Sequence, residues 1–177
     1  MINVTHVEGS LTPAQKAGLA ERLTGVLLEI EGGPAVDGPR ARSISWVLFH
    51  ELKEDAWAIG GKFDDTYVSP PGKFHIRVQV PEGSLSRERK AKVHRSVDEA
   101  IYDVLGLGVP PAPEARFPSI FVMIHEWDEG NAGALGQTWG LASIGAYVGA
   151  GDPAIRERSK AYLTARAKSR QAAGYPD

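Results

Sequence analysis

The residues best suited to chemistry include two histidine–glutamate pairs, His50-Glu51 and His125-Glu126, which lie 125 − 50 = 75 positions apart. Each pair resembles the start of the HExxH zinc motif, in which two histidines share one face of a helix. The second histidine is absent here, and both pairs end apolar, strand-like runs. We therefore interpret them as polar pairs at the ends of a sheet and expect no metal site.

Three arginines are candidates for binding a carboxylate. Arg40 and Arg42 precede an apolar run, and Arg77 lies beside His75 on a second strand-like segment. A guanidinium group binds a carboxylate through two parallel hydrogen bonds. The alternative for Arg40 and Arg42 is a surface loop charge, and for His75 and Arg77 it is an outward or interface position. The sequence leaves both alternatives open.

The composition excludes several classes of protein. The chain has 177 residues, 42% apolar, with 20 Lys and Arg against 22 Asp and Glu, so it lacks the basic surface of a nucleic-acid-binding protein. Without cysteine there is no disulfide or thiolate metal site. We see no signal peptide, membrane-spanning run or nucleotide-binding glycine motif, and we expect a soluble cytoplasmic protein without a cofactor or membrane partner.

The elements that must position these residues occur twice in the chain. The motif EGSL at residues 8–11 recurs at 82–85, an offset of 82 − 8 = 74. Thr12, with Gln15, and Ser86 are expected to cap the helices that follow. Both helices carry an apolar stripe at matching positions, and these are Leu19, Leu23, Val26, Leu27 and Ile30 in the first and Val93, Val97, Ala100, Ile101 and Val104 in the second.

Each copy predicts a β-α-β unit, whose two strands are parallel. We expect an α+β fold with two tandem units, a four-stranded mixed sheet, two helices on one face and a C-terminal helix. The expected strands are residues 2–7, 43–52 and the short return strand 57–61 in the first unit, and 74–80 and 119–127 in the second. The run WVLF at 46–49 is typical of a strand that is central or buried on both faces, so the sheets of neighbouring subunits are expected to pack together.

The domain boundaries follow from this repeat. We expect a core domain over residues 1–136, with units 1–61 and 74–136, and an extension over 137–177. The Gly-rich stretch 137–151 indicates closely packed backbone, and Asp152-Pro153 predicts the start of a helix over about 153–173. This helix is strongly basic, which suits a solvated surface helix, an arm on a neighbouring subunit, or the binding of an acidic partner.

These units resemble the tautomerase superfamily. The segments EGSLTPAQK and HELKEDAWAIGG carry the resemblance, which covers roughly Met1 to Gly136. The superfamily includes 4-oxalocrotonate tautomerase, macrophage migration inhibitory factor, malonate semialdehyde decarboxylase and cis-3-chloroacrylic acid dehalogenase. The resemblance implies chemistry by an N-terminal proline, whose amine serves as general base or acid, with arginines that hold the substrate carboxylate.

The chain departs from this pattern at the main catalytic positions. Neither unit starts its first strand with proline, because Met1-Ile2 and Phe74-His75 stand there, and the bulky Ile2 predicts that Met1 is retained. The positions of the family's two arginines hold Ser10 and Ser84 after the EG turns, and Trp46 and Phe121 in the second strands. The resemblance keeps Trp57 as a pocket aromatic. The alternative for Trp57 is a core or interface residue.

Two functions remain open on this reading. In the first, the protein is an isomerase for a small 2-keto or enol carboxylic acid, with the α-amine of Met1 as a substitute base and Trp57, Arg40, Arg42, His75 and Arg77 around the substrate. The alternative for Met1 is a capped or solvent-facing terminus. In the second function, the protein is a non-catalytic member that binds a ligand or serves as a scaffold. The resemblance implies a homotrimer in both cases.

Overall fold

The computed structural model describes residues 1–31, 37–148 and 153–174. Its centre is a four-stranded sheet in the order β2-β1-β3-β4. The strands are β1 (Ile2–Val7), β2 (Val47–Leu52), β3 (Phe74–Pro81) and β4 (Ile120–Trp127). β1 runs parallel to β2 and β3 parallel to β4, whereas the central pair β1 and β3 is antiparallel. The two β-α-β units and the mixed sheet predicted from the repeat are thereby confirmed.

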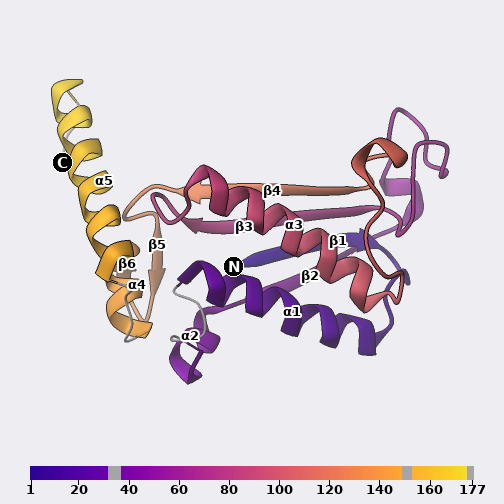
Figure 1. Ribbon diagram of the computed structural model, residues 1–177, viewed down its shortest axis with the longest axis horizontal. Helices are drawn as coiled ribbons and strands as arrows, with labels where there is room; N and C mark the ends of the chain where they lie inside the picture. Colours follow the sequence, from indigo (N-terminus) through magenta and orange to yellow (C-terminus); the bar gives the residue numbers. More distant parts are fainter. Residues whose placement is uncertain (32–36, 149–152, 175–177) are drawn as a thin grey trace.

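Two long helices, α1 (Pro13–Glu31) and α3 (Arg87–Val104), lie side by side on one face of the sheet (Figure 1). Both start where their caps predict. The Gln15 amide N–H donates to Thr12 Oγ1 (3.2 Å), and the Thr12 amide N–H donates to Gln15 Oε1 (2.9 Å). Ser86 Oγ accepts the amide N–H of Arg89 (3.3 Å). These bonds satisfy donors that have no partner inside the helix.

The core lies between these helices and the sheet. The inward side chains of β1 and β3 alternate with outward ones, so Ile2, Val4, Ile76 and Val78 are fully buried. The predicted helix stripes face them, and five of their residues are no more than 2% exposed. Those five are Leu19, Leu23, Leu27, Val97 and Ile101.

The repeated polar residues form the same ion pair in each unit. Lys16 Nζ on α1 lies 2.7 Å from Glu51 Oε1 at the end of β2, and Lys90 on α3 pairs with Glu126 on β4. Each lysine follows an EGSL motif and each glutamate belongs to a histidine–glutamate pair. Each pair therefore links the start of the unit's helix to the unit's second strand.

Shorter elements cluster at the ends of the sheet. The hairpin β5 (Ala132–Ala134) and β6 (Gln137–Trp139) follows β4 and leads into α4 (Leu141–Val148) and α5 (Pro153–Ala172). These elements and α2 (Pro39–Ile44) lie at the left of Figure 1, whereas the short 3-10 helices η2 (Glu54–Ala56) and η3 (Pro113–Ala115) follow β2 and precede β4. None of the described helices is long and apolar enough to cross a membrane.

Several predicted boundaries were wrong. Residues 43 and 44 end α2 instead of opening β2, because Pro39 starts a helical turn in the expected loop. The predicted return strand 57–61 is reduced to one bridge between Ile59 and Lys62, with Gly60 and Gly61 at positive φ. β2 is an edge strand and not a central one, and the exposure of Trp46 (60%) and Leu48 (39%) shows that WVLF is not covered on both faces within one chain. The predicted helix end at 32–34 and the cap at Asp152 lie outside the described residues.

Candidate active-site cleft

A cleft of about 1370 Å³ opens at the end of the sheet where β1 begins and β3 and β4 end. Met1, Gln79 and Trp127 line it from the sheet. Its other walls come from α2, the β5–β6 hairpin, α4 and α5, and from the end of α1. The cleft therefore lies between the predicted core domain and the C-terminal extension.

Met1 is fixed at the mouth of this cleft by backbone pairing with β3. Its α-ammonium group donates to the Gln79 carbonyl oxygen (3.1 Å), and its own carbonyl accepts the Gln79 amide N–H (2.8 Å). Met1 is 37% exposed. The α-amine is thus held in one place while remaining within reach of a ligand.

A chain of side-chain hydrogen bonds crosses the open face of the sheet towards Met1. His50 Nε2 donates to Asn3 Oδ1 (2.9 Å), since a carbonyl oxygen only accepts, and Asn3 Nδ2 donates to Gln79 Oε1 (3.1 Å). The Gln79 side-chain NH₂ is left as the donor at the end of this chain. Arg77 lies two residues before Gln79 on the same face of β3, exposed, and opposite Asn3. This corner of the sheet is rich in donors suited to an anion.

The two arginines of α2 have different surroundings. Arg42 forms ion pairs with Asp37 (2.6 Å) and Glu21 (3.1 Å). Hydrogen bonding to Asp37, and then to Glu21, raises the pKa of Arg42. Its donors are thus directed to these carboxylates and away from the cleft. Arg40 lies over the ring of Tyr147 on α4, 5.7 Å from its centroid, and so borders a cleft-lining residue.

Trp57 and His75 lie away from Met1 in the same chain. Trp57 follows η2, beyond Leu52, whose partner Val7 ends β1. The length of β1 separates this end from Met1, about 20 Å for six residues. His75 stacks on Phe121 on the open face (6.1 Å between ring centroids). Of the predicted site residues, Met1, Arg77 and Arg40 lie at or near the cleft.

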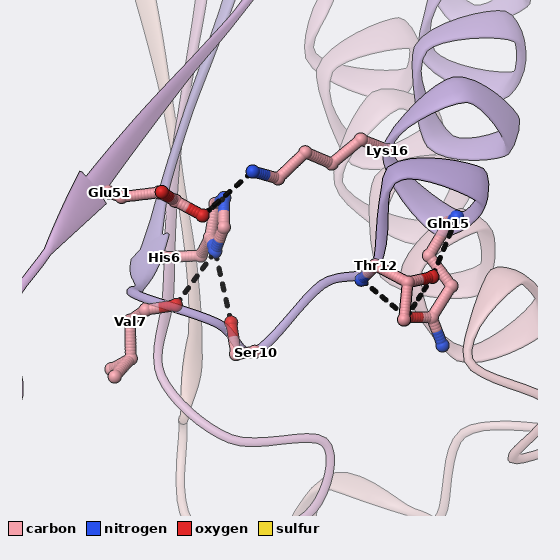
Figure 2. Close-up of polar contacts among 7 residues, drawn as sticks. All are labelled: His6, Val7, Ser10, Thr12, Gln15, Lys16 and Glu51. Carbon is pink, nitrogen blue, oxygen red and sulfur yellow. Dashed lines mark hydrogen bonds and ion pairs between the residues drawn. The ribbon is translucent and has the colours of Figure 1, made fainter.

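A second polar cluster surrounds the buried ring of His6 at the opposite end of β1 (Figure 2). His6 Nδ1 lies 2.9 Å from the Val7 carbonyl and 3.0 Å from Ser10 Oγ, and Nε2 lies 3.9 Å from Glu51 Oε1. A serine, a histidine and a carboxylate in sequence suggest nucleophilic catalysis. However, the Val7 carbonyl requires a proton on Nδ1, so this nitrogen does not accept the Ser10 proton. Ser10 is therefore not activated.

No metal-binding group of three or more His, Asp or Glu side chains occurs among the described residues. Within each histidine–glutamate pair, consecutive strand residues point to opposite faces of the sheet. His50 contacts Asn3 on the open face, whereas Glu51 binds Lys16 of α1. The polar pair expected at the sheet end thus consists of two residues that contact different elements on opposite faces.

Several cleft residues were missed in the sequence. Tyr147, Trp127 and Trp139 line the cleft, and the rings of Trp139 and Tyr147 are 4.9 Å apart. The close packing expected over residues 137–151 holds at one described glycine: a Cβ at Gly140 would overlap the carboxylate of Glu129, whereas a Cβ at Gly145 would meet no atom within 4 Å. The available signal was aromatic residues within a small-residue stretch, which gave no indication that α4 turns back towards Met1.

The fold and the cleft define a protein of two β-α-β units with its first residue at a cleft, and the comparisons agree with this class. Residues 75–141 match the family model described as "Tautomerase enzyme". No curated protein matches the sequence. The second of the two β-α-β units is therefore similar to the tautomerase family, and neither unit begins with proline.

Solved structures support the fold over most of the chain. A native fused 4-OT is 25% identical, with a TM-score of 0.59, and the match covers 81% of this chain and 98% of that one. N1, a member of the cis-3-chloroacrylic acid dehalogenase family, is 19% identical (TM-score 0.61; 90% and 97% covered). Macrophage migration inhibitory factor of Toxoplasma gondii is 17% identical (TM-score 0.55; 78% and 98% covered).

Proposed function

We propose that this protein is a tautomerase-type isomerase for a 2-keto or enol carboxylic acid, with the Met1 α-amine in the role of the missing proline. One observation supports this function above the others. Met1 lines a large cleft next to Gln79, and the exposed Arg77 lies two residues from Gln79 on the same face of β3. A base, a neutral donor and a cation adjacent to one another suit enolisation of an acid.

In the proposed reaction, Arg77 binds the substrate carboxylate and the side-chain NH₂ of Gln79 donates to the 2-oxo oxygen. The neutral Met1 amine takes the proton from C3, the electron pair of that C–H bond forms the C2–C3 double bond, and the carbonyl electron pair moves onto the 2-oxo oxygen. The resulting ammonium group of Met1 then gives its proton to this oxygen, which completes the enol. In the direction from enol to keto acid, the amine takes the O–H proton and returns it to C3. Arg40 is assigned a supporting role beside the substrate. Trp57 and His75 lie away from Met1 in their own chain, so we assign their supporting roles to the cleft of a neighbouring copy. Arg42 is the weakest candidate because its donors already bind Asp37 and Glu21.

The test is an enol–keto assay with phenylenolpyruvate and 2-hydroxymuconate, followed by ultraviolet absorbance. We expect turnover by the unmodified chain, loss of at least tenfold in kcat/KM when the Met1 amine is acetylated, and an increase when a proline is inserted before Ile2. Circular dichroism serves as the control for folding. The absence of any rate above buffer in all three forms would refute the isomerase.

The alternative is a non-catalytic, ligand-binding or scaffold protein. It is favoured by Ser10 and Ser84, which stand at the positions of a family arginine, and by the engagement of the Met1 amine with the Gln79 carbonyl. This function predicts carboxylate binding without turnover, or no small-molecule binding. A substrate turned over at Met1 would exclude it.

A homotrimer is part of both proposals. Fused 4-OT proteins of similar fold form asymmetric and symmetric trimers. On the face opposite α1 and α3, the apolar side chains of Leu48, Phe121 and Met123 are 39%, 55% and 47% exposed. Packing of sheets between copies would cover them. We assign Trp57 to the Met1 cleft of a neighbouring copy, because in its own chain it follows Leu52, at the end of the sheet opposite Met1.

We also propose the division into a core domain, residues 1–136 with units 1–61 and 74–136, and an extension over 137–177. The ion pairs repeated in the two units support this boundary. A cytoplasmic location belongs to the same proposal and is supported by the absence of cysteine. A stable, monodisperse fragment of residues 1–136 would favour the division.

A further inference from the structure

The size and lining of the Met1 cleft indicate what kind of acid it receives. Clefts of roughly 300–1,000 Å³ accommodate drug-sized ligands. A cleft of about 1370 Å³ is far larger than a four- or five-carbon keto acid requires. Most of the lining residues contributed by the hairpin and α4 are apolar, including Ala132, Leu135 and Ile144. The volume beyond Met1 is therefore suited to an apolar group.

The wall on α4 is held rigidly by contacts around Tyr147. Its ring contacts Trp139 (4.9 Å between centroids) and carries the guanidinium of Arg40 on its face (5.7 Å). Its hydroxyl lies 3.3 Å from Ser43 Oγ of α2. Trp139 is only 8% exposed. A wall fixed by contacts from two other elements, α2 and β6, is preorganised for a ligand and loses little conformational freedom on binding.

The charges lie at the sheet end of the cleft and at its rim. The Met1 ammonium group is at the sheet end, with Arg77 two positions from Gln79 on the same strand face. Lys160 and Glu157 of α5 line the far side and offset one another. The cleft therefore presents a cationic end next to a largely apolar interior, which is the complement of an amphiphilic carboxylate.

We propose that the ligand of this cleft is a carboxylate with a long or multi-ring apolar body, whose acid group lies at Met1 and whose body packs against α4. This inference rests on the proposed function and specifies its substrate class. The extension, by contributing α4 and α5 to the cleft, determines the specificity for the apolar body.

The test compares decanoate with butyrate and with decan-1-ol. Three of the four tryptophans, Trp46, Trp127 and Trp139, line the cleft, so intrinsic fluorescence reports binding below the critical micelle concentration. We expect decanoate to bind at least tenfold more tightly than either of the others. If butyrate bound as tightly as decanoate, the inference that the ligand has a long apolar body would be overturned. If decan-1-ol bound as tightly as decanoate, the inferred role of the carboxylate would be overturned.

A cleft-filling variant locates the binding. Ala146 on α4 is exposed and lines the cleft, so Ala146→Trp should weaken decanoate binding at least tenfold. The matched control is Ala91→Trp, at an exposed position on α3, which should bind like the unmodified protein. Thermal unfolding checks that both variants fold. Unchanged affinity in Ala146→Trp would refute the site. If the unmodified protein does not bind decanoate and Ala146→Trp changes the sedimentation mass, the site is also refuted and the cleft is assigned to a second copy.

Turnover separates this inference from the proposed function. Deuterium exchange at C3 of 2-oxododecanoate and 2-oxobutanoate, followed by NMR, should be at least tenfold faster in kcat/KM for the longer acid. Equal exchange of both acids would leave the isomerase intact and refute the ligand class. Tight decanoate binding with no exchange of either acid would refute the isomerase and retain the ligand class.

Discussion

At the scale of single residues, His6 is the side chain whose surroundings have the clearest physical consequence. Its ring is fully buried between Phe49 and Phe74, and Nε2 has no hydrogen-bond partner within the part of the chain that the structure describes. Burial is the largest effect and lowers the pKa of His6 from its ordinary value of 6.5, although the Val7 carbonyl acts in the opposite direction. The folded protein therefore holds this ring neutral.

The free energy of unfolding should fall as the pH decreases below about 6.5. The unfolded chain binds a proton at His6 first, because its pKa is the higher one, and the loss stops below the folded-state pKa. The slope is at most about 1.4 kcal/mol per pH unit for one proton. Urea denaturation at several pH values measures it.

His6→Val should remove this slope, because valine does not bind a proton. Valine is the chosen replacement because Val80 occupies the matching place in the second unit (6 + 74 = 80). His94→Gln, at an exposed position on α3, should retain it. Glu51 contributes at a lower pH. Its pKa is lowered chiefly by Lys16, so its stabilisation is lost only as the pH falls through the acidic range of a carboxyl group. Equal slopes in the unmodified protein and His6→Val would contradict the assignment.

Arg77→Gln should weaken carboxylate binding at the Met1 cleft without unfolding the protein. A hydrogen bond to a charged group contributes about 1.5–3 kcal/mol, which corresponds to roughly ten- to a hundredfold in affinity. Titration calorimetry with decanoate gives this ratio, with Arg87→Gln on the exposed side of α3 as the matched control. Similar losses in both variants would indicate a general effect of charge.

The role of a residue could be predicted from the sequence where its partners lie within a few positions along the chain. The caps Thr12 and Ser86 follow from their spacing to the helix start, and both are confirmed. Arg42 illustrates the limit, because its partners Asp37 and Glu21 come together only through the fold. A sequence does not indicate whether an arginine is already paired.

At the scale of elements, the helix α5 depends on an ion-pair cluster that has no counterpart in the first unit. Glu82, only 5% exposed, pairs with Arg166 of α5, which also lies 2.9 Å from Asp128. Arg170 is 3.7 Å from the same aspartate. The equivalent first-unit residue, Glu8, is exposed. The buried carboxylate of the second EG turn thus anchors the extension.

Arg166→Ala should release α5 from the cleft. The buried Glu82 loses its cation, and we expect the free energy of unfolding to fall by about 1–3 kcal/mol, because Arg166 is partly exposed and the change is smaller than for a fully buried pair. Hydrogen exchange of residues 157–172 measures the release, and Lys168→Ala is the control on the same helix. Equal protection in both variants would show that other contacts hold α5.

Elements with strong periodicity could be predicted and those shaped by packing could not. The apolar stripes of α1 and α3 predicted that both segments are helices and which face of each packs on the sheet, because apolar residues with a period of 3.6 are typical of an amphipathic helix. The short α2 begins at Pro39 within a segment rich in Gly and Arg, and α4 lies in a small-residue stretch without a polar face. Both line the cleft, which explains why the cleft itself was not predicted.

At the scale of the whole molecule, the open face of the sheet governs assembly. Phe121→Glu would place a charge where the proposed sheet packing buries an apolar side chain. We expect a trimer in sedimentation experiments for the unmodified protein and a monomer for this variant. Leu107→Glu, at an exposed position outside the sheet, should remain trimeric. A monomeric mass for the unmodified protein would refute the assembly.

The antiparallel pairing of β1 and β3 places the starts of the two units at opposite ends of the sheet. The end at Phe74 is filled by the chain itself, since Lys73 is buried there and its ammonium group donates to the carbonyls of Trp57 and Phe63. The cleft and the extension lie at the Met1 end. The stoichiometry of ligand binding should therefore be one per chain and three per trimer, instead of the six that two equivalent halves would give.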